Sequence, residues 1–113
     1  MTTSCLLPII FLFVGLIFII LSIPLIQEKI SPNVFYGFRT EKTLSNPDLW
    51  YKVNKDFGYK MLYLGVILIV CNLILLSFNR SLGITTILTI DLLILFVPLI
   101  ASILITAYNY NLR

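Results

Sequence analysis

The residues of this chain best suited to recognise a ligand are aromatic rings and a guanidinium gathered in one polar stretch. They are Tyr36, Phe38, Arg39, Trp50 and Tyr51. A guanidinium can bind a lipid phosphate through two parallel hydrogen bonds, or pair with a carboxylate such as Glu41 or Asp48. The alternative interpretation is structural: an aromatic belt at a membrane interface, with a salt bridge that holds the stretch in place.

A second candidate is Asp91, a carboxylate within an otherwise apolar stretch. An ionisable group in a membrane helix costs about 3 kcal/mol on insertion scales and is often functional. Asn72 precedes and Asp91 follows a turn centred near Ser81, each roughly 14 Å along its helix at about 1.5 Å per residue. We therefore predict that Asn72 and Asp91 hydrogen-bond across two antiparallel helices, with the carboxyl of Asp91 either ionised or protonated. Such a pair fixes helix register, or, alternatively, belongs to a proton or ion relay.

Other kinds of chemistry are disfavoured by residue content. The sequence has no histidine and two cysteines, Cys5 and Cys71, which lie near or within apolar segments. We therefore expect no metal site, no disulfide framework and no cofactor. There is no Ser/His/Asp set and no phosphate-binding loop, so we do not expect an enzyme. The net charge of +3 comes without a dense run of Lys and Arg, which favours anionic lipid headgroups over nucleic acid as a partner.

The elements that position these residues are membrane helices. The chain has 113 residues, 59% of them hydrophobic and 12% charged, whereas soluble domains carry about a quarter charged residues. The apolar stretches 6–26, 61–78 and 84–107 are each long enough to cross roughly 30 Å of hydrocarbon. We predict an all-α integral membrane fold, with residues 1–113 as a single domain of three transmembrane helices. The first stretch exceeds the roughly 7–15 apolar residues of a signal peptide, which favours a retained helix.

The polar stretch 27–60 separates the first two predicted spans. Its first half is predicted as a loop, and its second half as a short amphipathic helix. Ser45 or Asn46 can cap that helix, and Pro47 suits its first turn. Its apolar face consists of Leu49, Trp50, Val53 and Phe57. Such a helix lies in the headgroup region or packs on its own loop and on the spans, and these interpretations are compatible.

Basic residues predict the orientation. The polar stretch contains Lys29, Arg39, Lys42, Lys52, Lys55 and Lys60, whereas the connection near residue 80 contains Arg80 alone. Because cytoplasmic loops are rich in Lys and Arg, we expect the polar stretch in the cytoplasm. The N-terminus is then outside and the C-terminus inside, in a multi-pass protein of the plasma membrane.

The polar stretch resembles the signature of a known family. The similar positions are Asn33, Tyr36-Gly37-Phe38-Arg39-Thr40, Thr43-Leu44-Ser45-Asn46, Trp50, Asn54-Lys55 and Gly58. Their order and spacing resemble the SdpI/YfhL family of small bacterial membrane proteins. The resemblance implies three spanning helices per unit, immunity to a secreted peptide toxin, and a receptor role that holds a cytoplasmic transcriptional repressor at the membrane. It marks Tyr36, Gly37, Phe38, Arg39, Thr43 and Trp50 as candidates for recognition or for support of the loop, whereas Asp91 lies outside it.

Three functions follow as hypotheses. The first is immunity to, or sensing of, a membrane-active peptide toxin, with a cytoplasmic loop that recognises a lipid or a protein. The second is a small transporter that works as a homo-oligomer and uses Asp91. Small multidrug transporters have four helices and a glutamate in the first, which disfavours that hypothesis. The third is a passive scaffold or subunit.

Overall fold

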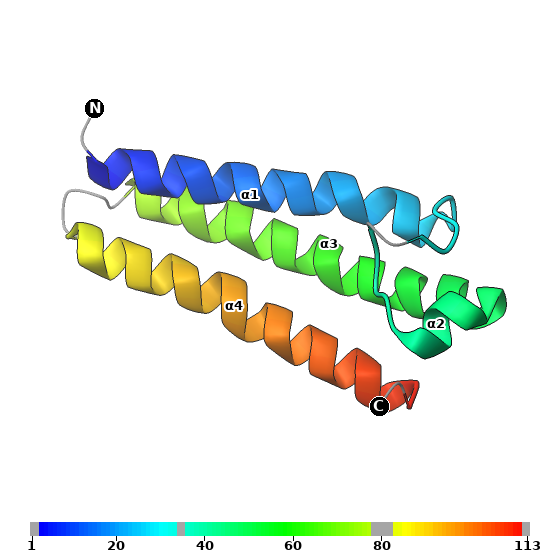
Figure 1. The fold of residues 1–113 in the computed structure, drawn as a ribbon. Helices are drawn as coiled ribbons and strands as arrows, with labels where there is room; N and C mark the ends of the chain where they lie inside the picture. The colour runs from blue at the N-terminus through cyan, green and yellow to red at the C-terminus, as the bar shows by residue number, and fades with distance from the viewer. Residues whose placement is uncertain (1–2, 34–35, 78–82, 112–113) are drawn as a thin grey trace.

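The computed structural model describes residues 3–33, 36–77 and 83–111. Within these ranges it contains four helices and no strand: α1 (Thr3–Ile26), α2 (Glu41–Ser45), α3 (Pro47–Ser77) and α4 (Ile84–Asn109). The three long helices lie side by side, with α3 antiparallel to α1 and to α4 (Figure 1). The molecule is elongated, with extents of 51 × 24 × 19 Å. The loop between α1 and α2 and the end of α4 therefore lie at the same end of the bundle.

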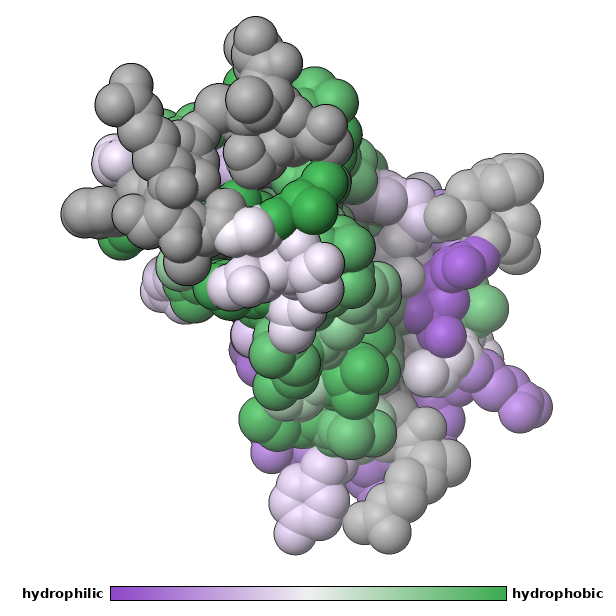
Figure 2. Space-filling model, turned by 90° about the vertical axis from the view of Figure 1, so that its left-hand side faces the viewer, coloured by the Kyte–Doolittle hydropathy of each residue, from purple (hydrophilic) through white to green (hydrophobic). Residues whose placement is uncertain are grey.

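Three helices are long and apolar enough to cross a membrane. They are Leu6–Ile26 within α1, Pro47–Ser77 and Ile84–Asn109. Large apolar side chains cover their outer surfaces; Leu104 is 63% exposed and Val97 59%. The view from the side that carries the N-terminus is mostly apolar, with the most hydrophilic side chains at its margins (Figure 2). The predicted all-α membrane fold with three spanning helices is confirmed.

The helix that contains the second predicted span begins well before that span, because α3 is one continuous helix from Pro47 to Ser77. It begins as predicted, with Pro47 in the first turn and the Leu49 N–H donating to Asn46 Oδ1 at 3.3 Å. The predicted amphipathic helix is thus the first part of α3, and the separate short helix between α1 and α3 is α2. No helix-ending residue separates Phe57 from Met61. Gly58 is not followed by proline, and it lies so close to α1 that a Cβ added to it would stand 3.0–3.3 Å from atoms of Leu25 and Ile26.

The tightest helix contact joins α1 to α3. A Cβ added to Gly15 would stand 2.7 Å from the carbonyl oxygen of Gly65, and one added to Gly65 would stand 2.6 Å from that of Gly15. The two backbones therefore touch, as at other membrane helix crossings built on small residues. Leu68, fully buried, lies beside this crossing.

The fourth helix, α4, is packed less extensively. It contacts α3 more than α1, and both contacts are smaller than the one between α1 and α3. Its buried residues are Ile87, Asp91 and Thr106. The predicted turn near Ser81 and the residues Val34, Phe35 and Arg113 lie outside the described residues.

Candidate functional site

The loop between α1 and α2 is fastened to α3 by Asn54. The backbone N–H of Phe38 donates to Asn54 Oδ1 at 2.5 Å, while Asn54 Nδ2 donates to the carbonyl oxygens of Trp50 at 3.0 Å and of Phe38 at 3.4 Å. Asn54 is almost fully buried, with 2% exposure. The side-chain amide of Asn54 thus bonds both the N–H and the C=O of Phe38, as the backbone of a neighbouring strand would do in a β-sheet. It fixes the position of the loop on the first turns of α3.

Gly37 allows the loop to approach α3 this closely. Its φ is +111°, a backbone conformation that residues other than glycine rarely adopt. An added Cβ would stand 2.8 Å from Asn54 Oδ1 and 3.1 Å from the Trp50 ring. Phe38, the next residue, packs edge-on against Phe57, with ring centroids 5.1 Å apart.

Other polar signature residues also hold the loop in place. The indole N–H of Trp50, fully buried, donates to the Ile30 carbonyl oxygen at 2.7 Å. The Thr43 hydroxyl donates to the carbonyl oxygen of Phe38 at 3.2 Å and accepts from the Thr40 N–H at 2.7 Å, which closes the capping box of α2.

The start of the signature binds back to α1. The Tyr36 hydroxyl donates to the Leu21 carbonyl oxygen, and the Tyr36 N–H donates to Asn33 Oδ1 at 2.8 Å. Burial raises the pKa of Tyr36 above its usual value. Asn33 Nδ2 donates to the Ser31 carbonyl oxygen at 2.8 Å. Together these bonds link the loop to the last turns of α1.

Unlike the signature residues described above, Arg39 does not use its side chain to hold the loop in place. Its side chain is exposed and forms no hydrogen bond or ion pair with another residue of the described chain. The carboxylate partners considered from the sequence, Glu41 and Asp48, do not bind it. Arg39 lines a groove of about 370 Å³, the Arg39 groove, whose other walls are Gly37, Phe38, Thr40, Phe57, Ile103 and Ala107. The groove thus combines one unpaired cation with apolar walls from the loop, α3 and α4.

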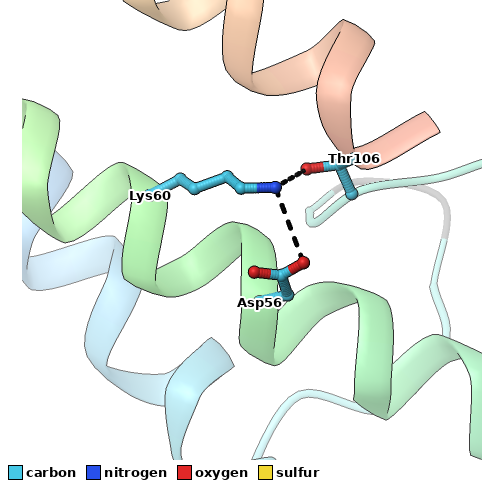
Figure 3. A network of polar contacts seen from close by, with 3 residues as sticks. All are labelled: Asp56, Lys60 and Thr106. Atoms are coloured by element: carbon cyan, nitrogen blue, oxygen red, sulfur yellow. Dashed lines mark hydrogen bonds and ion pairs between the residues drawn. The ribbon is translucent and has the colours of Figure 1, made fainter. Parts of the chain in front are cut away.

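The end of α4 is attached to α3 and to α2 by polar contacts. Lys60 Nζ lies 2.7 Å from Thr106 Oγ1 and 3.5 Å from Asp56 Oδ2, so it links two helices (Figure 3). Lys42 Nζ donates to the Asn111 carbonyl oxygen at 2.7 Å. Burial, the charge of Asp56 and a hydrogen bond to Asp56 raise the pKa of Tyr110. These contacts keep Ile103 and Ala107 beside the loop.

The intramembrane pair lies in the opposite half of the bundle. Asn72 in α3 and Asp91 in α4 are both fully buried. Asn72 Nδ2 donates to the Leu68 carbonyl oxygen at 2.7 Å. Within the part of the chain that the structure describes, Asn72 Oδ1 and both Asp91 carboxylate oxygens have no hydrogen-bond donor. The predicted hydrogen bond between Asn72 and Asp91 stays a prediction.

Sequence reasoning thus identified the segment that builds the site but not its supports. Asn54 was noted only as part of the resemblance, although a polar residue on an apolar helix face between Val53 and Phe57 is a signal of a buried hydrogen-bonding role. The bonds from Lys42 and Lys60 to the end of α4 connect residues far apart in sequence, and no local pattern predicts them.

The chain matches a model of a known protein family. A family model described as the SdpI/YfhL protein family matches residues 29–108, from the loop after α1 to the last turn of α4. No curated protein and no solved structure shows a significant match to the chain. The resemblance drawn from the signature residues is confirmed.

Proposed function

Because this chain belongs to the SdpI/YfhL protein family, we propose that it protects a cell against, or senses, a membrane-active peptide toxin. Family membership and three helices of spanning length support a protein that resides where such a peptide acts. The helices meet the peptide in the plasma membrane. The loop end, on the cytoplasmic side by the positive-inside rule, meets a second partner such as a repressor-type protein.

The observation that carries this proposal is the unpaired state of Arg39. Asn33, Tyr36, Thr43 and Trp50 use their side-chain polar atoms within the protein, whereas the guanidinium of Arg39 is exposed and has no partner among the described residues. A loop that is hydrogen-bonded to α3 and presents one free guanidinium beside apolar walls suits a partner with a carboxylate or phosphate next to an apolar group. Arg39 is therefore the recognition residue, and its signature neighbours position it.

A survival assay tests the proposal. Cells that express the chain should grow in the presence of a membrane-active peptide that kills cells carrying an empty vector. Arg39→Ala should weaken protection without lowering the amount of protein in the membrane. Arg39→Lys should weaken it less, because lysine keeps the charge but not the two-pronged geometry.

The matched control is Lys29→Ala, which removes an exposed cation from the same loop but outside the Arg39 groove. It should protect as well as the unmodified chain. Full protection by Arg39→Ala would remove Arg39 from the proposal, and an absence of protection by the unmodified chain would remove the immunity function itself.

A further inference from the structure

The first turns of α3 have a second, polar face that plays no part in holding the loop. Its residues recur at intervals of three and four, which places them on one side of the helix: Asp48, Tyr51, Lys52, Lys55, Asp56 and Tyr59. Together with Glu28, just past α1, and Tyr110, just past α4, they line a groove of about 570 Å³, the polar groove. It is separate from the Arg39 groove, with which it shares no lining residue.

The charges in the polar groove are of both signs and mostly unpaired. Asp56 pairs with Lys60. In contrast, the carboxylates of Glu28 and Asp48 and the ammonium groups of Lys52 and Lys55 are exposed and bind no other residue of the described chain. Two anions and two cations thus line one groove without neutralising each other. A ligand that carries both charges can complement them together.

The polar groove starts at the depth of lipid headgroups and extends from there toward the aqueous phase. The apolar part of α3 that follows Lys60 extends for roughly 26 Å at about 1.5 Å per residue, close to the thickness of the hydrocarbon layer. Residues before Lys60 therefore lie in the headgroup region or beyond it. Tyr59 and Tyr110 mark the boundary, as tyrosines commonly do at membrane interfaces.

We propose that the polar groove binds the phosphoethanolamine headgroup of a membrane phospholipid. Lys52 and Lys55 bind the phosphate, and Glu28 and Asp48 accept hydrogen bonds from the ammonium group. A primary ammonium has three N–H donors, whereas the trimethylated nitrogen of choline has none. A glycerol headgroup carries no positive charge for the two carboxylates. The groove therefore prefers phosphatidylethanolamine to phosphatidylcholine and to phosphatidylglycerol.

Native mass spectrometry of the purified full chain in detergent tests this preference. The chain is titrated separately with phosphatidylethanolamine, phosphatidylcholine and phosphatidylglycerol of identical acyl chains. We expect phosphatidylethanolamine to be retained most strongly. Lys52→Gln, Lys55→Gln and Asp48→Asn should each weaken its binding by about 2- to 5-fold, as expected for exposed charge pairs. Lys29→Gln, a charge removal outside the groove, should leave binding unchanged.

Three outcomes would overturn the proposal: equal retention of the three lipids, a preference that survives Lys52→Gln and Asp48→Asn, or an equal loss in Lys29→Gln. Soluble phosphoethanolamine is added as a competitor to identify the source of the headgroup. If it displaced the lipid at equal concentration, the assignment to a membrane lipid would be wrong. These readouts are independent of the survival assay, so this proposal and the immunity function can fail separately.

Discussion

Gly65→Ala provides a sharp test of how α1 and α3 are held together. In water, replacing a helical glycine by alanine stabilises a helix by roughly 1 kcal/mol. In a bilayer the separated helices keep their backbone hydrogen bonds, since lipid offers no replacement, so this gain is largely absent from the free energy of helix association. The steric effect of the new methyl group then decides whether Gly65→Ala strengthens or weakens the association of α1 with α3.

The size of that effect follows from the crossing geometry. The new Cβ would stand 2.6 Å from the Gly15 carbonyl oxygen, whereas ordinary contact begins at 3.4 Å, so the helices must separate by about 0.8 Å. A gap of that size loses a quarter to a half of each atom contact of about 0.1–0.2 kcal/mol. For about 20 contacts from a buried leucine such as Leu68 to α1, the loss is roughly 0.5–2 kcal/mol. With neighbouring contacts included, we expect a destabilisation of about 1–3 kcal/mol, typical of overpacking.

Unfolding in mixed micelles, with SDS as denaturant and Trp50 fluorescence as the signal, measures this change. Trp50 is the chain's one tryptophan and is fully buried, so its emission reports unfolding. The control is Gly83→Ser, because a Cβ at Gly83 would meet no atom within 4 Å from other described parts of the chain, and serine is a favourable residue at the start of α4. Gly65→Ala with unchanged or increased stability would refute the close approach of α1 and α3.

Three further predictions concern the loop, the intramembrane pair and the residues near the end of α4. Gly37→Ala should lower the unfolding free energy by about 1–3 kcal/mol in the same assay, because the residue has a φ of +111°. Asp91→Asn should keep wild-type stability, since a second amide can donate to Asn72, whereas Asp91→Leu should lose about 0.6–2 kcal/mol; equal losses would contradict the predicted pairing. In a spectrophotometric titration, Asp56→Asn should lower the raised pKa of Tyr110 toward its ordinary value. Because the pKa of Tyr110 is raised in the folded state, Tyr110 stabilises the fold at pH values below about 10, the pKa of an unperturbed tyrosine. This contribution to the unfolding free energy is lost as the pH rises through the pKa of Tyr110 in the folded state.

The features that could be predicted from sequence are those with a local signal. Uninterrupted apolar stretches indicate spans, and Asn46-Pro47 indicates a helix start, which the structure places at Pro47. The continuation of α3 through Gly58 was not predicted, because a glycine beside charged residues is typical both of a helix end and of a close helix contact. Only the position of α1 against Gly58 distinguishes them.

The sequence predicted which residues belong to the candidate site, but not which of them hold the loop in place and which remain free to bind a ligand. Tyr36, Trp50 and Arg39 all have side chains that can recognise a ligand, and sequence alone treats them alike. In the structure, Leu21 and Ile30 accept the hydrogen bonds of Tyr36 and Trp50, and neither acceptor is a residue that a motif would select. The roles depend on backbone carbonyl groups, whose positions follow from the fold.

The unbroken course of α3 connects bilayer thickness to the position of the loop. A spanning helix changes its tilt when the membrane around it thins or thickens. The part of α3 from Pro47 to Leu68 is about 31 Å long at about 1.5 Å per residue, so a tilt of about 10° around Leu68 moves Pro47 sideways by roughly 5 Å. Because Asn54 binds the loop to α3, a change in the tilt of α3 also changes the position of Arg39 relative to the membrane.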